Sequence, residues 1–497
     1  MQMKKWQEEF SRTVARSPSL WLLLIVAAYL FCALNVDLAA NLSWHDGQRM
    51  AQLALLALGV TVFLALPGIS SSVISAWHCM NQPAMLALTG LFLLGVLSGL
   101  LSALPRWAFL ELGMVIMLGT LALMVAVARA EAGEFADSVL LTCIFFTALA
   151  YAVKTAVVYG AMLAIGPGYG MSFDVRDLYT GFSNIRFFGH VQTMLLPLLM
   201  LPVMWWAKNW RQRLVLGLVP VIWWILVIGS GTRGTWVALS IGIVAVLIFG
   251  GAAGRTWLKW QLVVIGGGGA GYAMLTMAVP ATVGMPAAIT DQIRSMVSLS
   301  RREEIWGAAL EHAERFPWFG IGPMHFAQYP NTVAAHPHNV ILQFMAEWGI
   351  PAALLATFVL AAGGWAWAKQ VRSAAAAEPH ARKSLLAVAL LAALAGAAAQ
   401  SMVDGVIVMP VSQILLVLVA GWAMGLYIQS KRPPLSAASA GAKLLALLLV
   451  LSAAGAVVQG VAPDILEVGQ REQAYLKTRP PGEILFPRFW AQGWINK

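Results

Sequence analysis

Long stretches of hydrophobic residues recur along the chain from residue 20 to residue 459, separated by short polar segments. Each stretch approaches the roughly 20 residues that an α-helix needs to cross the hydrocarbon core of a bilayer. The pattern therefore predicts an all-α integral membrane protein with about 12–13 transmembrane helices. These predicted helices lie near residues 20–37, 50–67, 84–104, 107–128, 138–163, 186–206, 213–230, 234–250, 260–279, 350–368, 384–403, 411–428 and 441–459.

Composition and charge agree with this class of protein. Hydrophobic residues make up 60% of the chain and charged residues only 11%, whereas soluble domains carry roughly 25% charge. The net charge of +10 does not indicate nucleic acid as a partner, because the basic residues lie in short clusters between apolar stretches. With the N-terminus in the cytoplasm, those clusters all fall on the cytoplasmic side, as the positive-inside rule expects. Membrane lipids are the predicted surroundings, and loss of either weak span, 50–67 or 441–459, would reverse the side of one terminus.

The predicted topology divides the chain into four parts. Residues 1–280 hold transmembrane helices 1–9, residues 281–349 form a helical external segment, residues 350–459 hold the remaining transmembrane helices, and residues 460–497 form a tail without a predicted role. In the external segment, Ser300 and Glu303 form a capping-box pattern that starts a helix. One apolar face of that helix is expected to be buried, and it consists of Ile305, Ala308, Ala309, His312, Ala313 and Phe316.

Two histidines precede the apolar stretch that follows the external segment, in the order His336-Pro337-His338-Asn339. A neutral imidazole accepts a proton from a hydroxyl group, and the positive end of a helix dipole keeps it neutral. His338 is therefore a candidate general base, with Asn339 as the helix N-cap. The alternative is a pair of polar residues in a surface loop. A metal site is disfavoured because no Cys, Asp or Glu lies nearby in the sequence.

Two arginines lie at the ends of predicted membrane helices. Arg186 begins one apolar stretch, and Arg233 lies between two spans that have almost no connecting loop. An arginine at that depth is costly unless it faces an anion or a polar cavity. Because the planar guanidinium matches phosphate oxygens, the two arginines are candidates for holding a pyrophosphate group without metal. The alternative is an interfacial anchor whose charged end reaches the water. His190, one turn beyond Arg186, is a candidate hydrogen-bond partner.

Three further charged residues are candidates on the external face. Arg301 and Arg302 occupy the first turn of the external helix, where the helix dipole disfavours cations, so they indicate either a bound anion or a solvated helix start. Asp404 is a lone carboxylate at the outer end of a span, and we expect it to pair with one of the arginines. The glycine run 266–271 lies inside an apolar stretch, which favours close helix packing over a nucleotide-binding loop.

Several short motifs keep a common order over about 50 residues. They are Arg302-Glu303-Glu304-Ile305-Trp306, Pro317-Trp318-Phe319-Gly320-Ile321-Gly322, His336-Pro337-His338-Asn339 and Glu347-Trp348-Gly349. This arrangement resembles the signature of the O-antigen ligase and polymerase superfamily. The segments 184–190 and 232–234 resemble two further motifs of that family, so the likeness covers roughly residues 180–350.

The resemblance implies a glycosyltransferase without cofactor or metal, embedded in the bacterial inner membrane with its active site facing the periplasm. Such an enzyme moves a glycan from undecaprenyl pyrophosphate to an acceptor. The leading interpretation is a ligase that joins O-antigen to the lipid A core. The family's essential histidine corresponds to His338, and its essential arginines correspond to Arg186, Arg233 and Arg302. Asn339, His336, Arg301, His190 and Asp404 are expected to support them.

The resemblance leaves three alternatives open. The first is a polymerase, whose acceptor is another lipid-linked glycan. The second is a protein O-oligosaccharyltransferase, although such members usually carry a Gln-Pro-Asn-His type of motif where this chain has Ser183-Asn184-Ile185-Arg186. The third is a lipid-glycan transporter, although transporters commonly show related halves with broken helices at the midplane.

Overall fold

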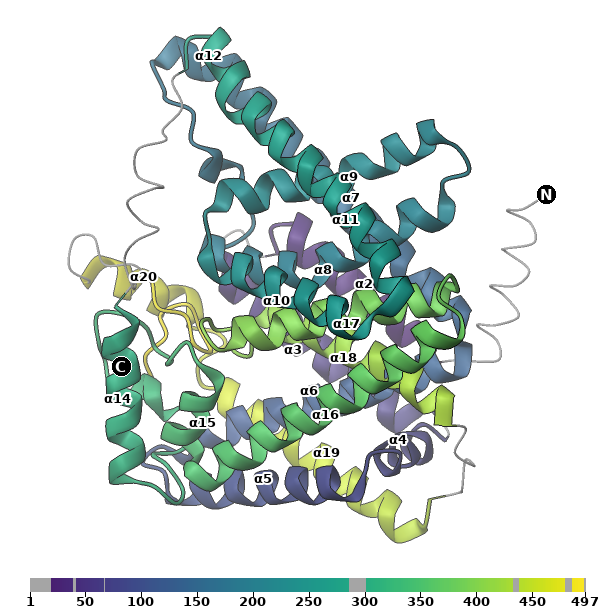
Figure 1. The fold of residues 1–497 in the computed structure, drawn as a ribbon. Helices are drawn as coiled ribbons and strands as arrows, with labels where there is room; N and C mark the ends of the chain where they lie inside the picture. Colours follow the sequence, from purple (N-terminus) through teal and green to yellow (C-terminus); the bar gives the residue numbers. More distant parts are fainter. Residues whose placement is uncertain are drawn as a thin grey trace.

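The computed structural model describes residues 19–38, 42–66, 68–285, 301–431, 438–478 and 485–495. These residues are mainly helical and form no β-sheet, and Figure 1 shows their arrangement. The long apolar helices are α2 (Leu20–Asn35), α3 (Trp44–Ala65), α5 (Gln82–Leu101), α6 (Pro105–Ala132), α7 (Glu134–Ile165), α8 (Ile185–Trp206), α9 (Trp210–Ser230), α10 (Arg233–Phe249), α11 (Gly251–Tyr272), α16 (Ile350–Ala377), α17 (Arg382–Ser401), α18 (Pro410–Lys431) and α19 (Ala440–Val461).

These helices confirm the predicted all-α membrane protein. Within the described ranges, 11 helices are long and apolar enough to cross a membrane, and the apolar helices α2 and α10 are shorter. Each predicted stretch has a counterpart, including the two weak ones. The observed helices often begin earlier than predicted, because their first turns are polar. Helix α3, for example, begins at Trp44, and the Ser43 side chain caps it by accepting a hydrogen bond from the Asp46 backbone N–H.

The most buried helix is α8, which lies between α17, α9 and α10. Helices α5, α11 and α16 lie at the periphery, where less than a quarter of their apolar windows is buried inside the protein. The glycine run 266–271 belongs to α11, and it packs against α9: a Cβ atom added to Gly268 would lie 2.5 Å from the Cβ of Trp224. This contact supports the prediction that the run serves close helix packing.

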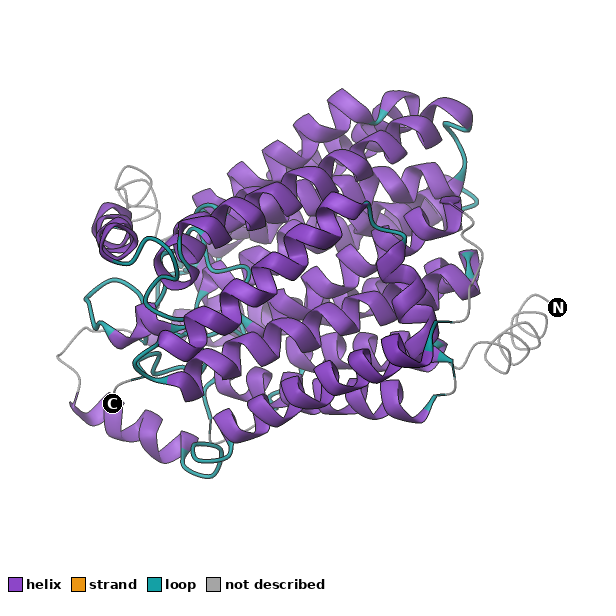
Figure 2. Ribbon diagram, turned by 90° about the horizontal axis from the view of Figure 1, so that it is seen from below, coloured by secondary structure: helices purple, strands orange, loops and turns teal. Residues whose placement is uncertain are grey.

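The loops and the small helices gather mainly at one end of the bundle (Figure 2). The helices at this end are α14 (Arg302–Arg315), α15 (Val340–Trp348) and α20 (Val468–Thr478). The remaining short elements are α4 (Ile69–His78), α12 (Val279–Thr282), the π-helical turn Ala273–Ala278 and the 3₁₀ turns Gly166–Tyr169, Val175–Leu178 and His325–Gln328, the last of which contacts α15.

Helix α14 packs against α15 through the predicted apolar face. Ile305, Ala309 and Ala313 are buried, which agrees with the prediction. Phe316 is a correction, because half of its surface is exposed: α14 ends at Arg315, and the backbone of Phe316 leaves the helical conformation. The predicted cap residue Ser300 lies outside the described residues, and the residue at the N-cap of the described helix is Arg301.

Candidate functional site

The loop that precedes α15 holds His338 in an unusual backbone conformation. Its φ angle is 53°, in the left-handed region that residues other than glycine rarely adopt. The His338 backbone N–H donates to Nδ1 of His336 at 3.3 Å, and the two rings meet edge to face with centroids 4.1 Å apart. His336 is buried, whereas 13% of the His338 side chain is exposed. His338 is therefore held by its neighbours and still accessible.

Asn339 connects this loop to a second one. Its side-chain oxygen accepts hydrogen bonds from the backbone N–H groups of Ile341 and Leu342, both at 3.0 Å, which confirms the predicted N-cap of α15. Its amide nitrogen donates to the carbonyl of Met402 at 3.1 Å. Met402 begins the linker 402–409 between α17 and α18. The cap therefore fixes the histidine loop to the linker that carries Asp404.

Asp404 lies between two histidines. Its Oδ1 is 3.4 Å from Nδ1 of His338, and its Oδ2 is 3.3 Å from Nε2 of His190. His190 is fully buried in α8, and its Nδ1 is 2.8 Å from the hydroxyl of Ser412. The sequence predicts an arginine as the partner of Asp404 and Arg186 as the neighbour of His190. It does not predict this His–Asp–His arrangement.

The charges of this group favour a neutral His338 beside an ionised Asp404. Burial lowers the pKa of His338, Asp404 opposes this, and the positive charges of Arg186 and Arg302 lower the pKa further. Burial alone would raise the pKa of Asp404, but its contacts with His190 and His338 lower it well below its usual value. A carboxylate beside Nδ1 favours the tautomer with the proton on that nitrogen, which leaves Nε2 of His338 free to accept a proton.

Three arginines from three helices contribute positive charge near His338 and Asp404. Arg186, Arg233 and Arg302 lie in the first turns of α8, α10 and α14, and each is partly buried. Burial lowers the pKa of Arg302, and the positive charges of Arg186 and Arg233 lower it further, while Asp404 raises it. The first turn of a helix also presents backbone N–H groups and the positive end of its dipole. The region therefore has an excess of positive charge suited to an anion with several oxygens.

The Arg302 side chain also has a hydrogen-bond donor without an acceptor. Its Nε atom is buried and has no hydrogen-bond acceptor among the described residues. A buried donor without an acceptor costs about 1–3 kcal/mol, and an anionic ligand would supply the acceptor. Arg301 differs, because its exposed side chain pairs with Glu304 at 2.7 Å and donates to Thr332 at 2.9 Å. Of the two neighbouring arginines, the structure thus directs Arg302 toward the site and leaves Arg301 on the surface.

Other polar residues near the site were not predicted. Thr232 and Thr235, at the start of α10, share a hydrogen bond of 2.9 Å, and the Gln400 amide of α17 donates to Thr235 at 3.3 Å. Gln400 follows the apolar stretch Leu385–Ala399 of α17, and polar residues inside membrane helices mark interior or functional positions. That signal was available in the sequence. Arg49 was overlooked because the predicted span began at residue 50, one position after it.

Comparison with known families places part of this site in a recognised domain. Residues 218–357 match a family model described as O-antigen ligase. This part of the chain is similar to the O-antigen ligase family. The match confirms the resemblance to the O-antigen ligase and polymerase superfamily, and it supports a function of the ligase or polymerase type in a multi-pass membrane protein. No curated protein matches the chain.

The matched segment contains Arg233, Arg302 and His338. Arg186, His190 and Asp404 lie outside it in the sequence, on α8 and in the linker after α17. The fold brings the two sets together. The group of charged side chains therefore includes residues of the matched segment and residues on both sides of it in the sequence.

Proposed function

We propose that this protein transfers O-antigen polysaccharide from undecaprenyl pyrophosphate to the lipid A core oligosaccharide, at the periplasmic face of the bacterial inner membrane. The observation that carries the proposal is the contact between His338 and Asp404 in a region where the charges of Arg186, Arg233 and Arg302 act on one another and on His338. The family match over residues 218–357 supports the same function. The arginines provide a site for a pyrophosphate, and the histidine provides a base beside it.

The donor is expected to bind through its pyrophosphate. The guanidinium groups of Arg186, Arg233 and Arg302 each present a planar pair of N–H donors that suits phosphate oxygens. Their positive charge is fixed before the donor arrives, so it also stabilises the negative charge that grows on the pyrophosphate as it leaves. A polyprenyl chain attached to that pyrophosphate belongs in the bilayer, which is consistent with arginines located at the ends of apolar helices.

The proposed reaction is a single displacement. The oxygen of an acceptor hydroxyl forms a bond to the anomeric carbon of the first sugar, and the bond from that carbon to the pyrophosphate oxygen breaks. The pyrophosphate leaves with the electron pair, and the hydroxyl proton moves to Nε2 of His338. Asp404 stabilises the imidazolium that results. Attack opposite the leaving group inverts the anomeric carbon.

The test of the function is product analysis with purified protein. Synthetic undecaprenyl-pyrophosphate-linked glycan and lipid A core are mixed with the protein, and the products are analysed by mass spectrometry. A covalent glycan–lipid A core adduct is the expected result. A longer glycan on the polyprenyl lipid would identify a polymerase instead, a glycan attached to an added acceptor protein would identify a protein O-oligosaccharyltransferase, and movement of the lipid without covalent product would identify a transporter.

Asp404→Asn is expected to slow transfer by about 10²-fold or more, because an amide neither fixes the tautomer of His338 nor stabilises its protonated form. The variant is also expected to change the pH dependence of the rate. The base is active above its pKa, and Asp404 raises the pKa of His338. Removing the negative charge therefore lowers that pKa and moves the acidic limb of the rate profile to lower pH.

The measurement is the transfer rate of wild-type protein and variant between about pH 5 and pH 8, the range that brackets the ordinary histidine pKa. Glu304→Gln is the matched control, because Glu304 is an exposed carboxylate paired with Arg301. The control should keep the wild-type rate and profile. A wild-type rate in Asp404→Asn would rule out the role assigned to the carboxylate.

A further inference from the structure

The segment 485–495, here called the C-terminal segment, follows α20 in the chain and is largely buried. The aromatic residues Phe486, Phe489, Trp490 and Trp494 are each less than a tenth exposed. In Figure 1 the yellow trace of this segment lies on the side of the bundle that carries α14 and α15. A buried, non-helical segment needs partners for its backbone polar groups. Its hydrogen bonds therefore identify the elements that it connects.

Helix α3 supplies partners for the backbone of this segment. The carbonyl of Phe489 lies 3.0 Å from Nε2 of His45 and accepts from Nε of Arg49 at 3.1 Å. The backbone N–H of Ala491 donates to Oδ1 of Asp46 at 2.7 Å. The polar first turns of α3, which extend beyond the predicted apolar span, therefore hold the C-terminal segment in place.

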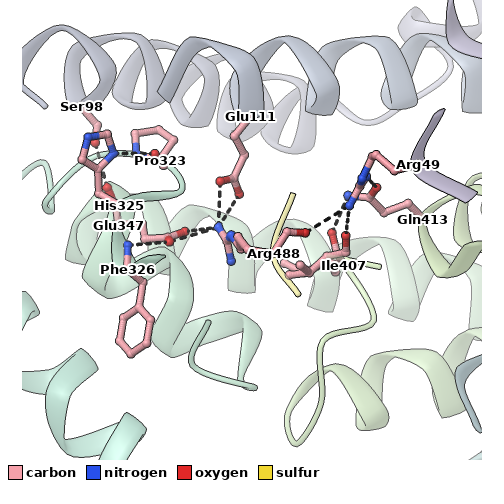
Figure 3. A network of polar contacts seen from close by, with 11 residues as sticks. Arg49, Ser98, Glu111, Pro323, His325, Phe326, Glu347, Ile407, Gln413 and Arg488 are labelled. Atoms are coloured by element: carbon pink, nitrogen blue, oxygen red, sulfur yellow. Dashed lines mark hydrogen bonds and ion pairs between the residues drawn. The ribbon is translucent and has the colours of Figure 1, made fainter. Parts of the chain in front are cut away.

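Arg488 of the C-terminal segment joins two further helices (Figure 3). Its side chain is 2% exposed, and its Nη2 atom lies 2.8 Å from a carboxylate oxygen of Glu111 in α6 and 2.8 Å from one of Glu347 in α15. With its amide oriented toward Arg488, the side-chain oxygen of Gln343 in α15 also accepts from Nη1 at 2.8 Å. One guanidinium group thus ties α15 to α6.

The helix held by Arg488 is the one that begins beside His338. Glu347 is the last residue but one of α15, and the N-cap of the same short helix is Asn339. The C-terminal segment also contacts the histidine loop directly. Gly493 lies against Ala335, where an added Cβ atom would be 3.1 Å from the Ala335 Cβ. Nearby, the backbone N–H of Ile495 donates to the carbonyl of Ala327 in the 3₁₀ turn His325–Gln328 at 3.2 Å.

The linker that carries Asp404 is connected to the same segment. Nη2 of Arg49 donates to the carbonyl of Val408 in this linker at 2.7 Å and to the carbonyl of Arg488 at 3.3 Å. The C-terminal segment therefore contacts, directly or through Arg49, both loops that meet at the His338–Asp404 pair. Arg186, Arg233 and Arg302 belong to other helices, α8, α10 and α14.

We propose that the C-terminal segment completes the active site and that Arg488 is a positioning residue, which fixes α15 and thereby His338 relative to Asp404 and the bound donor. The inference rests on the proposed transfer reaction. In this proposal the C-terminal segment affects the rate of the chemical step, and the arginines on α8, α10 and α14 bind the donor. Loss of Arg488 should therefore lower kcat much more than it weakens binding of the donor.

The test compares full-length Arg488→Gln and Arg488→Lys with wild-type protein. The expected result for Arg488→Gln is a kcat reduced about tenfold or more with donor KM changed less than about threefold, the pattern of an interaction used in the transition state. Arg488→Lys should recover part of kcat because it restores a positive charge between the carboxylates. Arg471→Gln is the matched control, since Arg471 also pairs with acidic residues, Asp464 and Glu467, but lies in α20. It should keep wild-type kcat and KM.

Gly493→Ala gives a second test that changes no charge. Gly493 has a φ angle of 81°, and a Cβ atom there would lie 1.8 Å from the carbonyl oxygen of Phe486. The turn must shift to admit it, so this variant should show the same fall in kcat at nearly constant donor KM. Glu347→Gln, which loses the carboxylate that joins α15 to Arg488, should behave likewise.

Three results would overturn the proposal. The first is wild-type kcat in both Arg488→Gln and Gly493→Ala. The second is a parallel loss of kcat and donor affinity, and the third is failure of all these variants to fold, since either would make the segment a general stability element. If wild-type protein itself formed no adduct with donor and lipid A core, the proposed function would fail instead, which separates the two claims.

Discussion

Replacement of His338 by alanine is expected to lower the rate of glycan transfer by about 10²–10⁴-fold, the usual contribution of a positioned general base. The reason is geometric as well as chemical. His338 is partly exposed, its Nδ1 faces Asp404 at 3.4 Å, and burial holds its pKa below the ordinary value so that the ring is neutral near pH 7. The measurement is single-turnover transfer with purified protein and saturating lipid-linked glycan.

The variant is expected to fold and to bind donor, because the proposed pyrophosphate site is formed by arginines on α8, α10 and α14. His312→Gln is the matched control. His312 lies on α14 and packs against the ring of Tyr329 with centroids 4.5 Å apart, between the same two apolar helices, α11 and α16, as His338 in the sequence. It should keep the wild-type rate. Near-normal turnover in His338→Ala would exclude the role of general base.

Arg233→Lys is expected to weaken binding of the lipid-linked glycan by about tenfold. Lysine keeps the positive charge but lacks the planar pair of N–H groups that a pyrophosphate engages. Arg233 is the first residue of α10, and its charge acts on Arg302 within the proposed site. The measurement is donor KM together with direct binding of an undecaprenyl-pyrophosphate-linked glycan.

The control for this prediction is Arg301→Lys. Arg301 lies next to Arg302 in the sequence, but its side chain is exposed and paired with Glu304. The substitution on the surface should leave donor KM and turnover unchanged. Equal donor affinity and equal rate in Arg233→Lys and wild-type protein would remove Arg233 from the pyrophosphate site.

Much of the fold follows from local pattern alone. A membrane-spanning helix needs a minimum length of apolar residues, and all the predicted stretches are helices in the structure. Asn339 was found because a cap is set by residues next to it in sequence. Arg186 and Arg233 are candidates from the sequence because a charge at the end of an apolar stretch is costly, and this cost marks the position without knowledge of the fold. Their role in binding a pyrophosphate stays a prediction.

The contacts between side chains that lie far apart in the chain could not be predicted from the sequence. Asp404 contacts His190 and His338 from elements far apart in the chain, and no periodic pattern encodes such a contact. The C-terminal segment has no helical period and is too short to span a membrane, so its aromatic residues gave no structural prediction. Phe316 was placed on a buried face because the pattern did not show that α14 ends one residue before it.

The most direct test of the site is a cryo-EM map of His338→Ala with undecaprenyl-pyrophosphate-linked glycan bound, since the variant should bind the donor without consuming it. We expect density for the pyrophosphate within hydrogen-bond distance of the guanidinium groups of Arg186, Arg233 and Arg302, with the anomeric carbon of the first sugar facing the position of residue 338. Density for the pyrophosphate away from those arginines, or a first sugar turned away from residue 338, would contradict it.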